Sequence, residues 1–166
     1  MSSPLMRDFT IVLTRELDGL VRELEAFPDD AAMWSVLPGV SNSAGNLTLH
    51  VAGGLLHFVG AMLGKTGYVR DRDAEFNRRS GTRAELIDEV RRARRVVETV
   101  LHALPETALE STLSHPSLPG PVPTQRMRGH LCAHAAFHLG QVGYLRRLLT
   151  GENQSAGPLP MKPLLD

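Results

Sequence analysis

Cysteine is almost absent from this sequence of 166 residues, which contains only Cys132. A single cysteine cannot form a disulfide within the chain, so a disulfide-stapled fold is excluded and a reducing compartment is favoured. The N-terminus lacks the apolar core of a signal peptide, because Arg7 and Asp8 interrupt it, and no run of about 18 apolar residues occurs. We therefore expect a cytoplasmic protein that does not span a membrane.

An excess of charge of either sign is also lacking, because 18 Lys and Arg residues balance 18 Asp and Glu residues. Without a basic surface, neither a nucleic acid nor an acidic membrane is expected as a partner. The only lysines are Lys65 and Lys162, and this preference for arginine indicates a GC-rich bacterial genome. The length suffices for one domain, residues 1–166, that buries about 70% of its unfolded surface.

Four segments repeat apolar residues at intervals of three and four, the pattern of amphipathic helices. We expect helices at about residues 4–27, 43–64, 82–104 and 124–150. Ser43 and the capping box Thr82-Arg-Ala-Glu85 begin the second and third helices, and Gly151 ends the fourth. The remaining segments are connections at 28–42 and 105–123, a polar stretch at 65–81 and an irregular tail at 151–166. The sequence thus predicts an all-α protein, a four-helix bundle.

The fourth predicted helix carries His130, His134 and His138 at a spacing of four, which places their side chains on one face about 5–6 Å apart. The apolar stripe of this helix consists of Met127, Leu131, Val142, Leu145 and Leu149. His134 and His138 occupy the missing steps of the stripe, where a bundle core normally has leucine or isoleucine. Burying an unpartnered imidazole costs roughly 1–3 kcal/mol, and neutral imidazoles are common metal ligands, so we expect a metal ion there.

Three ligands at positions i, i+4 and i+8 would span about 12 Å, so at most two of these histidines bind the same ion. Spacing alone does not choose between the pairs His130/His134 and His134/His138, but the apolar stripe favours the second pair. A third ligand must then come from another helix, and His50 on the inner face of the second helix is the best candidate. His57 shares that face but lies about 10 Å farther along the axis, too far to bind the same ion.

Two other features are open to more than one interpretation, and for two more residues a single environment is expected. The pair Gly53-Gly54 follows His50 by one turn and either admits a neighbouring helix or leaves space for a ligand. Trp34 is expected to close one end of the core, and lining a substrate pocket is the alternative. Cys132 lies about 200° around the helix from His134 and is expected to be a small buried residue that points away from the site. His115 is expected to be exposed.

The polar stretch at residues 65–81 is expected to be a solvated surface excursion, held to the bundle by Phe76. Asp71, Asp73 and Glu75 alternate with arginines within it. These carboxylates could hold a cation, but pairing with the neighbouring arginines is favoured. Motifs for other chemistries are missing: the sequence has no Glu-x-x-His pairs of a di-iron bundle, no phosphate-binding loop and no nucleophile elbow.

Two motifs resemble those of the DinB superfamily of bacterial metalloenzymes. They are Asn42-Ser43 with Leu47-x-Leu49-His50 on the second helix, and His134-x-x-x-His138-x-Gly140-Gln141 on the fourth. Trp34 followed by Pro38-Gly39 fits the same pattern, and the stretch 69–76 is similar to a segment of one uncharacterised subgroup. The resemblance extends over residues 5–150 or so.

The resemblance implies an up-down-down-up four-helix bundle that holds one divalent metal ion, nickel or zinc, through His50, His134 and His138. It also implies homodimers and, in many members, thiol-dependent S-transfer or isomerisation with a low-molecular-weight thiol such as bacillithiol or mycothiol. Family members often have a second histidine beside the final ligand, where this chain has Leu139. This difference removes an accessory imidazole but no ligand.

We therefore expect a mononuclear metal-dependent enzyme, a transferase or hydrolase, that acts on a small-molecule electrophile. The metal would lower the pKa of a bound thiol or water. Gln141 would support the ligands by hydrogen bonding, while His57 and His130 are candidates for catalytic proton carriers. The alternative is a non-catalytic bundle that binds a metal or a small molecule and whose histidines are structural or lie at a dimer interface.

Overall fold

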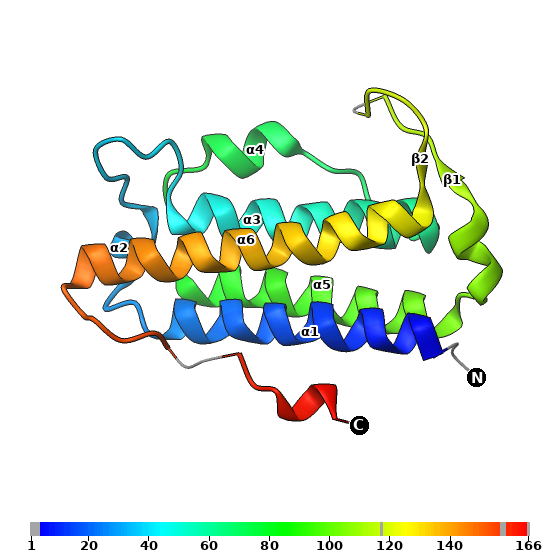
Figure 1. The fold of residues 1–166 in the computed structure, drawn as a ribbon. Helices are drawn as coiled ribbons and strands as arrows, with labels where there is room; N and C mark the ends of the chain where they lie inside the picture. The colour runs from blue at the N-terminus through cyan, green and yellow to red at the C-terminus, as the bar shows by residue number, and fades with distance from the viewer. Residues whose placement is uncertain (1–3, 117, 157–158, 166) are drawn as a thin grey trace.

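The computed structural model describes residues 4–116, 118–156 and 159–165, so three positions of the predicted tail, 157, 158 and 166, lie outside it. The chain is mostly helical, and its long helices lie side by side (Figure 1). These are α1 (Pro4–Glu25), α3 (Ala44–Leu55) with its continuation η1 (Leu56–Leu63), α5 (Arg83–Ala103) and α6 (Thr124–Thr150). Helices α1 and α3 each pack against both α5 and α6. The core therefore lies between these helices.

Shorter elements connect the long helices. They are α2 (Asp30–Trp34), α4 (Arg72–Asn77), the 3-10 helices η2 (Glu106–Glu110) and η3 (Lys162–Leu164), and the strands β1 (Thr112–Leu113) and β2 (Val122–Pro123). The two strands are antiparallel, with Thr112 opposite Pro123 and Leu113 opposite Val122. The connection 105–123 thus contains a helical turn and a short ladder, which its many prolines did not reveal.

Side-chain caps determine where α3 and α5 begin. The Ser43 hydroxyl accepts a hydrogen bond from the backbone N–H of Asn46, and the Asn46 side chain accepts one from the backbone N–H of Ser43. Thr82 and Glu85 form the predicted capping box at the start of α5. Each box satisfies backbone donors that a helix N-terminus otherwise leaves free. At the other end of α6, Gly151 adopts the left-handed conformation, with φ +74°, that favours glycine.

The second long helix differs from the single α-helix expected over residues 43–64. Its last turns, Leu56–Leu63, are π-helical. At the end of this segment, the backbone N–H of Gly64 donates to the carbonyl of Val59, five residues earlier, at 2.9 Å. A wider turn rotates the following side chains away from the positions that a 3.6-residue period predicts. Residue spacing alone therefore cannot place the side chains of this part of the helix.

By length and composition alone, the segment Ala44–Leu63 is apolar enough to cross a membrane. Most of this segment is buried within the protein, however. Such burial is typical of the core helix of a soluble protein, in which apolar side chains are covered by neighbouring helices. We therefore interpret it as a core helix.

A buried ion pair joins α1 to α6 and to the C-terminal tail. The Arg146 Nε lies 2.6 Å from Glu23 Oε2, and Arg146 is only 1% exposed. Arg146 also donates to the carbonyl of Gln154, while the backbone N–H of Ala156 donates to Glu23. The tail, which was expected to be irregular, contains the short helix η3, and its first part is held against the bundle by charged hydrogen bonds.

Trp34 lies buried where the chain passes from α2 towards α3. Its Nε1–H donates to the carbonyl of Gly81 at 2.8 Å, and a Cβ at Gly45 would come within 2.8 Å of the indole ring. The ring therefore packs between three segments of the chain. This placement favours the interpretation of Trp34 as a residue that closes the core.

Candidate metal centre

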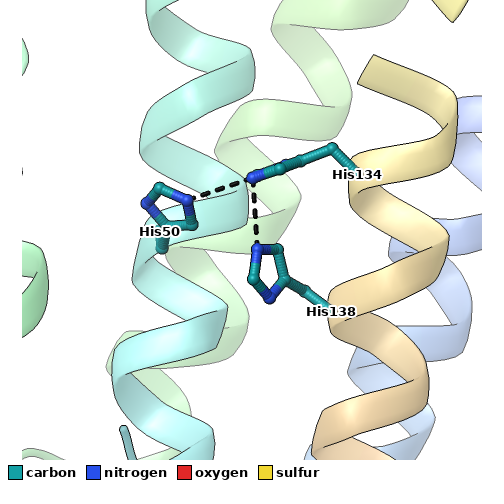
Figure 2. Close-up of side chains that lie close together, drawn as sticks. All are labelled: His50, His134 and His138. Atoms are coloured by element: carbon teal, nitrogen blue, oxygen red, sulfur yellow. Dashed lines mark hydrogen bonds between the residues drawn. The ribbon is translucent and has the colours of Figure 1, made fainter. Parts of the chain in front are cut away.

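His50 of α3 and His134 and His138 of α6 converge between the two helices (Figure 2). The Nε2 atom of His134 lies 3.0 Å from Nε2 of His50 and 3.2 Å from Nε2 of His138. One ligand atom from each of the three residues lies within 4.8 Å of the others. We refer to these residues as the histidine triad. Three close histidines of this kind could hold one metal ion.

The outer ring nitrogens of two triad histidines have hydrogen-bond partners. His138 Nδ1 lies 2.7 Å from Gln141 Oε1, and His50 Nδ1 lies 3.0 Å from both Glu75 Oε2 and Arg70 Nη2. An amide or carboxylate oxygen accepts, so the contacts with Gln141 and Glu75 suit the tautomer with the proton on Nδ1, which leaves the Nε2 lone pair free for a metal ion. Gln141 is thus bonded to His138, the kind of contact expected of it.

The triad cannot satisfy itself by hydrogen bonding in this arrangement. His134 Nε2 carries either one proton or one lone pair and can form only one good hydrogen bond, yet it lies beside Nε2 of both His50 and His138. Two ligands bound to one ion at about 2.1 Å, with bond angles of about 90–109°, lie about 3.0–3.4 Å apart. The observed separations of 3.0 and 3.2 Å lie in that range. The residues therefore fit a metal ion better than they fit one another.

The rings of His134 and His138 offer neutral nitrogen donors around neutral pH. Burial, with the neighbouring imidazoles of His138 and His50, lowers the pKa of His134 to about 3. Burial likewise lowers the pKa of His138, and the hydrogen bond to Gln141 only partly opposes this effect. Metal binding requires unprotonated imidazole nitrogens, so the environment favours the ligand form.

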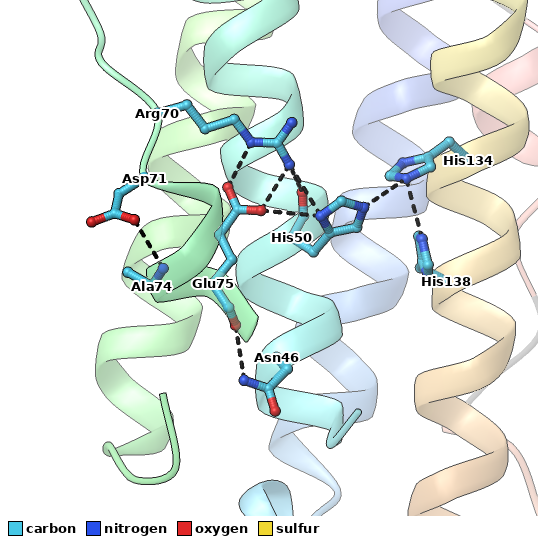
Figure 3. A network of polar contacts seen from close by, with 8 residues as sticks. All are labelled: Asn46, His50, Arg70, Asp71, Ala74, Glu75, His134 and His138. Atoms are coloured by element: carbon cyan, nitrogen blue, oxygen red, sulfur yellow. Dashed lines mark hydrogen bonds and ion pairs between the residues drawn. The ribbon is translucent and has the colours of Figure 1, made fainter. Parts of the chain in front are cut away.

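Glu75 and Arg70 form a charged network behind His50 (Figure 3). Glu75 is buried, with 6% exposure, and accepts hydrogen bonds of 2.7 Å from both Nε and Nη2 of Arg70. Burial by itself would raise the pKa of Glu75, but the hydrogen bonds from His50 and Arg70 lower it overall. A carboxylate bonded to the outer nitrogen of a ligand histidine orients the ring and increases its basicity.

The glycine pair on α3 makes room for this network. A Cβ at Gly53 would overlap Glu75 Oε1, and one at Gly54 would contact Arg70 Nη2 at 3.7 Å. Asn46 holds α4 in place, because its side-chain N–H groups donate to the carbonyls of Glu75 and Arg78. Gly53 therefore admits the Glu75 side chain of the neighbouring helix α4, in agreement with the first interpretation, whereas a Cβ at Gly54 would make only an ordinary van der Waals contact.

The expectation of a solvated excursion at residues 65–81, held by Phe76, fits most of the stretch, including the exposed residues 71–74, but not Glu75, which is buried. Helix α4 packs on α3, and Phe76 lies against His50 with ring centroids 4.7 Å apart. The exposed Asp71 caps α4 by accepting from Ala74 N–H, and Asp73 is also exposed. The carboxylates do not gather around a cation in the described structure. The favoured pairing with arginine occurs, but at a buried position that sequence reasoning did not assign to the site.

The two candidate proton carriers lie outside the triad. His130 is exposed, and its ring centroid is 5.4 Å from that of His134. His57 is buried beside His115, with ring centroids 4.4 Å apart, and neither of its ring nitrogens has a hydrogen-bond partner among the described residues. Burial and His115 lower the pKa of His57. Their roles as proton carriers stay predictions.

Two further expectations need correction. His115 is half-buried rather than exposed, because the connection before α6 brings its ring against His57. Cys132 is half-buried rather than fully buried, and burial raises the pKa of its thiol to about 11. The charges that act on this thiol belong to Arg128, Glu16 and Arg15, not to the triad. Cys132 is therefore a thiol at neutral pH and is not placed to attack a substrate at the triad.

Comparison with known proteins gives one match. Residues 13–142 match the family model of the DinB superfamily. No curated protein and no solved structure matches the chain significantly. The matched region covers most of the chain and contains all three histidines of the triad. We conclude that this chain belongs to the DinB superfamily.

Proposed function

We propose that the protein is a mononuclear, divalent-metal-dependent enzyme whose metal ligands are His50, His134 and His138. The observation that carries this proposal is the convergence of three Nε2 atoms at separations that suit one ion, while Glu75 and Gln141 bond to the outer nitrogens of two of the rings. The metal we propose is nickel or zinc, because imidazole nitrogen suits both.

A bound divalent cation would lower the pKa of a thiol or water molecule at the site and polarise an electrophile. Three protein ligands are the usual number for a catalytic zinc-type site, which needs a further position for water or substrate. The chain's own contribution is to hold the rings. Glu75 and Gln141 restrain His50 and His138 through their outer nitrogens, and Phe76 packs against the His50 ring.

The reaction that we propose is thiol-dependent S-transfer to a small electrophile, or a related metal-assisted nucleophilic reaction. The thiol loses its proton, its sulfur forms a bond to the electrophilic carbon, and the bond from that carbon to the leaving group breaks. The thiol must come from a low-molecular-weight co-substrate, because the only cysteine keeps its proton at neutral pH. His57 and His130 are the side chains that we propose to carry protons.

We further propose an up-down-down-up order for the long helices, a single domain, a cytoplasmic location and a homodimer. The order of the helices is supported by the connection through α4, which lies along α3 between the end of η1 and the start of α5 (Figure 1). The apolar side chain of Phe137, which is 62% exposed on α6, supports the dimer.

A non-catalytic metal-binding bundle is the second candidate. The observation in its favour is that both ring nitrogens of His50 and of His138 already have partners. The outer nitrogens contact Glu75 and Gln141, and the inner nitrogens face His134. No base other than a ligand therefore lies within the triad itself among the described residues. A protein of this kind would gain stability from the metal but would not turn over a substrate.

Metal analysis of tag-free protein tests the metal centre. We expect about one equivalent of a divalent metal per chain and its loss in His134→Ala and His138→Ala. The matched control is His102→Ala, because His102 is exposed on α5. Circular dichroism would establish that each variant folds. Retention of stoichiometric metal by both triad variants would rule out the proposed ligands.

A thiol-conjugation assay separates the enzyme from the non-catalytic bundle. Protein with and without chelator is incubated with a small thiol and an electrophile such as chlorodinitrobenzene, and its Tm is measured in parallel. Turnover that disappears with the metal supports the enzyme. A large loss of Tm on chelation without turnover for any thiol and electrophile supports the non-catalytic alternative.

A further inference from the structure

A pocket of about 430 Å³ adjoins the triad on the side of His138. It lies between the connection at residues 39–42, the first turn of α3 and the second half of α6. His138 forms part of its wall, and so does Gln141, which holds the His138 ring. Pockets for small molecules have volumes of about 300–1,000 Å³, so this one is large enough to hold part of a substrate.

The lining of the pocket is uncharged. Leu47, Leu145 and Leu148 supply apolar surface, and the polar groups are hydroxyl, amide, phenol and imidazole. None of the described lining residues is Lys, Arg, Asp or Glu. Burying a charged group of a ligand without a partner is costly, whereas burying apolar surface is favourable. The chemistry of the wall therefore selects a neutral group.

The charged residues near the triad lie on the other side of His50. Arg70 donates to both oxygens of Glu75 and also contacts His50. Its guanidinium group is thus already engaged by a buried carboxylate, and neither residue lines the pocket beside His138. The triad consequently has a charged side, which supports His50, and a neutral side, which leads into a cavity.

The outer wall of the pocket includes two largely exposed side chains, Tyr144 and Leu148, and the Arg147 guanidinium lies over the Tyr144 ring, 4.4 Å from its centroid. Tyr144 and Leu148 are 66% and 67% exposed and lie four residues apart, on one face of α6. Both contribute to the lining. A molecule bound at the triad through its reacting atom would cover them if its remaining part extended along α6.

We propose that this pocket binds an uncharged, largely apolar group of the substrate that reacts at the metal. The proposal rests on the proposed metal centre and adds the class of substrate: a neutral molecule with an apolar portion of a few carbon atoms. The polar groups of the lining accept or donate hydrogen bonds to a neutral ligand but do not neutralise an ionic one.

A series of alkanethiols tests the proposal on the Co²⁺-loaded protein. The thiol sulfur binds the metal, its charge-transfer absorption reports binding, and the alkyl chain probes the pocket. From ethanethiol through butanethiol to hexanethiol, we expect the affinity to rise by up to about fourfold for each methylene group, as for apolar surface removed from water. Mercaptohexanoate, which carries a carboxylate at the end of a similar chain, should bind at least about tenfold more weakly than hexanethiol.

Two variants show where the alkyl chain binds. Leu148→Ser should reduce the dependence on chain length and leave the affinity for ethanethiol nearly unchanged. The matched control is Leu165→Ser, because Leu165 is 80% exposed and lies in the tail. This control should retain the full dependence. Equal reductions in both variants would overturn the assignment to the pocket.

The outcomes distinguish this proposal from the metal centre on which it rests. Co²⁺ that does not bind would overturn both. Co²⁺ and ethanethiol that bind with no dependence on chain length would overturn the pocket alone. A third outcome combines thiol binding that does not depend on chain length with a protein that sediments as a dimer, and as a monomer after Leu148→Ser. This outcome would show that a second copy of the chain covers the Leu148 face, and it would likewise overturn the proposal.

Discussion

Glu75 Oε2 lies 3.0 Å from Nδ1 of His50, although the two residues are 25 positions apart and belong to different helices. This contact restrains the His50 ring from its outer side, while Nε2 faces His134. The segment that carries Glu75 is therefore part of the metal centre. Its residues do not bind the metal in our proposal, but they determine how one ligand is presented.

Substitution of Glu75 should weaken metal binding. We expect Glu75→Ala to lower the affinity about 10–100-fold, because His50 loses the acceptor that orients it, and Glu75→Gln to have a smaller effect because an amide oxygen still accepts. Competition with a chromophoric chelator measures the affinity. Asp73→Ala is the control, since Asp73 is exposed on the same short helix. Equal affinities of Glu75→Ala and Asp73→Ala would contradict the assigned role.

Two glycine-to-alanine changes should affect different properties: Gly53→Ala the metal affinity, and Gly129→Ala the free energy of unfolding. Gly53→Ala places a methyl group where Glu75 Oε1 lies, so the carboxylate must move and metal affinity should fall about tenfold or more. Gly129→Ala meets no atom within 4 Å on α6 and should stabilise the protein by up to about 1 kcal/mol through helix propensity. Metal competition and urea unfolding of both variants provide the comparison. Unchanged metal affinity in Gly53→Ala would count against the network.

Acid should destabilise the metal-free protein more than its surface charges predict. The pKa of His134 is lowered from 6.5 to about 3, so between these pH values the unfolded chain binds a proton that the folded protein does not. This contribution to stability is therefore complete above about pH 6.5 and is lost as the pH falls towards 3. The ring is only partly buried, so solvent screening reduces the size of the effect.

Thermal unfolding of chelator-treated protein over a pH range of about 7.5 to 4.5 measures this contribution. The variant His134→Leu restores the apolar stripe of α6 and should show a shallower fall of Tm with decreasing pH. An equally steep fall in the variant would mean that His134 does not contribute to the acid sensitivity.

The buried pair Glu23–Arg146 should be important for stability rather than for metal binding. Arg146→Leu leaves the Glu23 carboxylate buried without its charged partner, and we expect a loss of about 3–5 kcal/mol in the free energy of unfolding. Removal of the exposed pair Arg92–Glu89 by Glu89→Gln should cost less than about 1 kcal/mol. Urea unfolding compares the two variants. Similar losses in both would contradict the importance of burial.

The positions of the long helices followed from local sequence signals. Periodic apolar residues and caps such as Ser43 and Thr82 predicted helix starts that lie within one residue of those in the structure. The interruption of the α6 stripe by His134 and His138 indicated the candidate site for the same reason, because the apolar face of an amphipathic helix can be read from residue spacing. His50 was chosen from the inner face of its helix in a similar way.

Contacts between distant segments had no such signal. The pairing of Glu75 with His50 depends on the path of the chain between η1 and α5, and the half-burial of His115 depends on the connection before α6. The π-helical turns of η1 also escaped prediction, because a wider turn changes the period on which the reasoning relies.

Residue spacing was therefore sufficient to predict where the long helices lie and which histidines lie on their inner faces. Both properties depend on backbone geometry over a few residues. The folded chain alone brings Glu75 and Arg70 behind His50 and places a neutral pocket beside His138. These relationships arise from packing between helices, where a side chain's neighbours depend on the course of every connection. A glycine pair such as Gly53-Gly54 can indicate that space is needed, but only the fold shows which side chains occupy it.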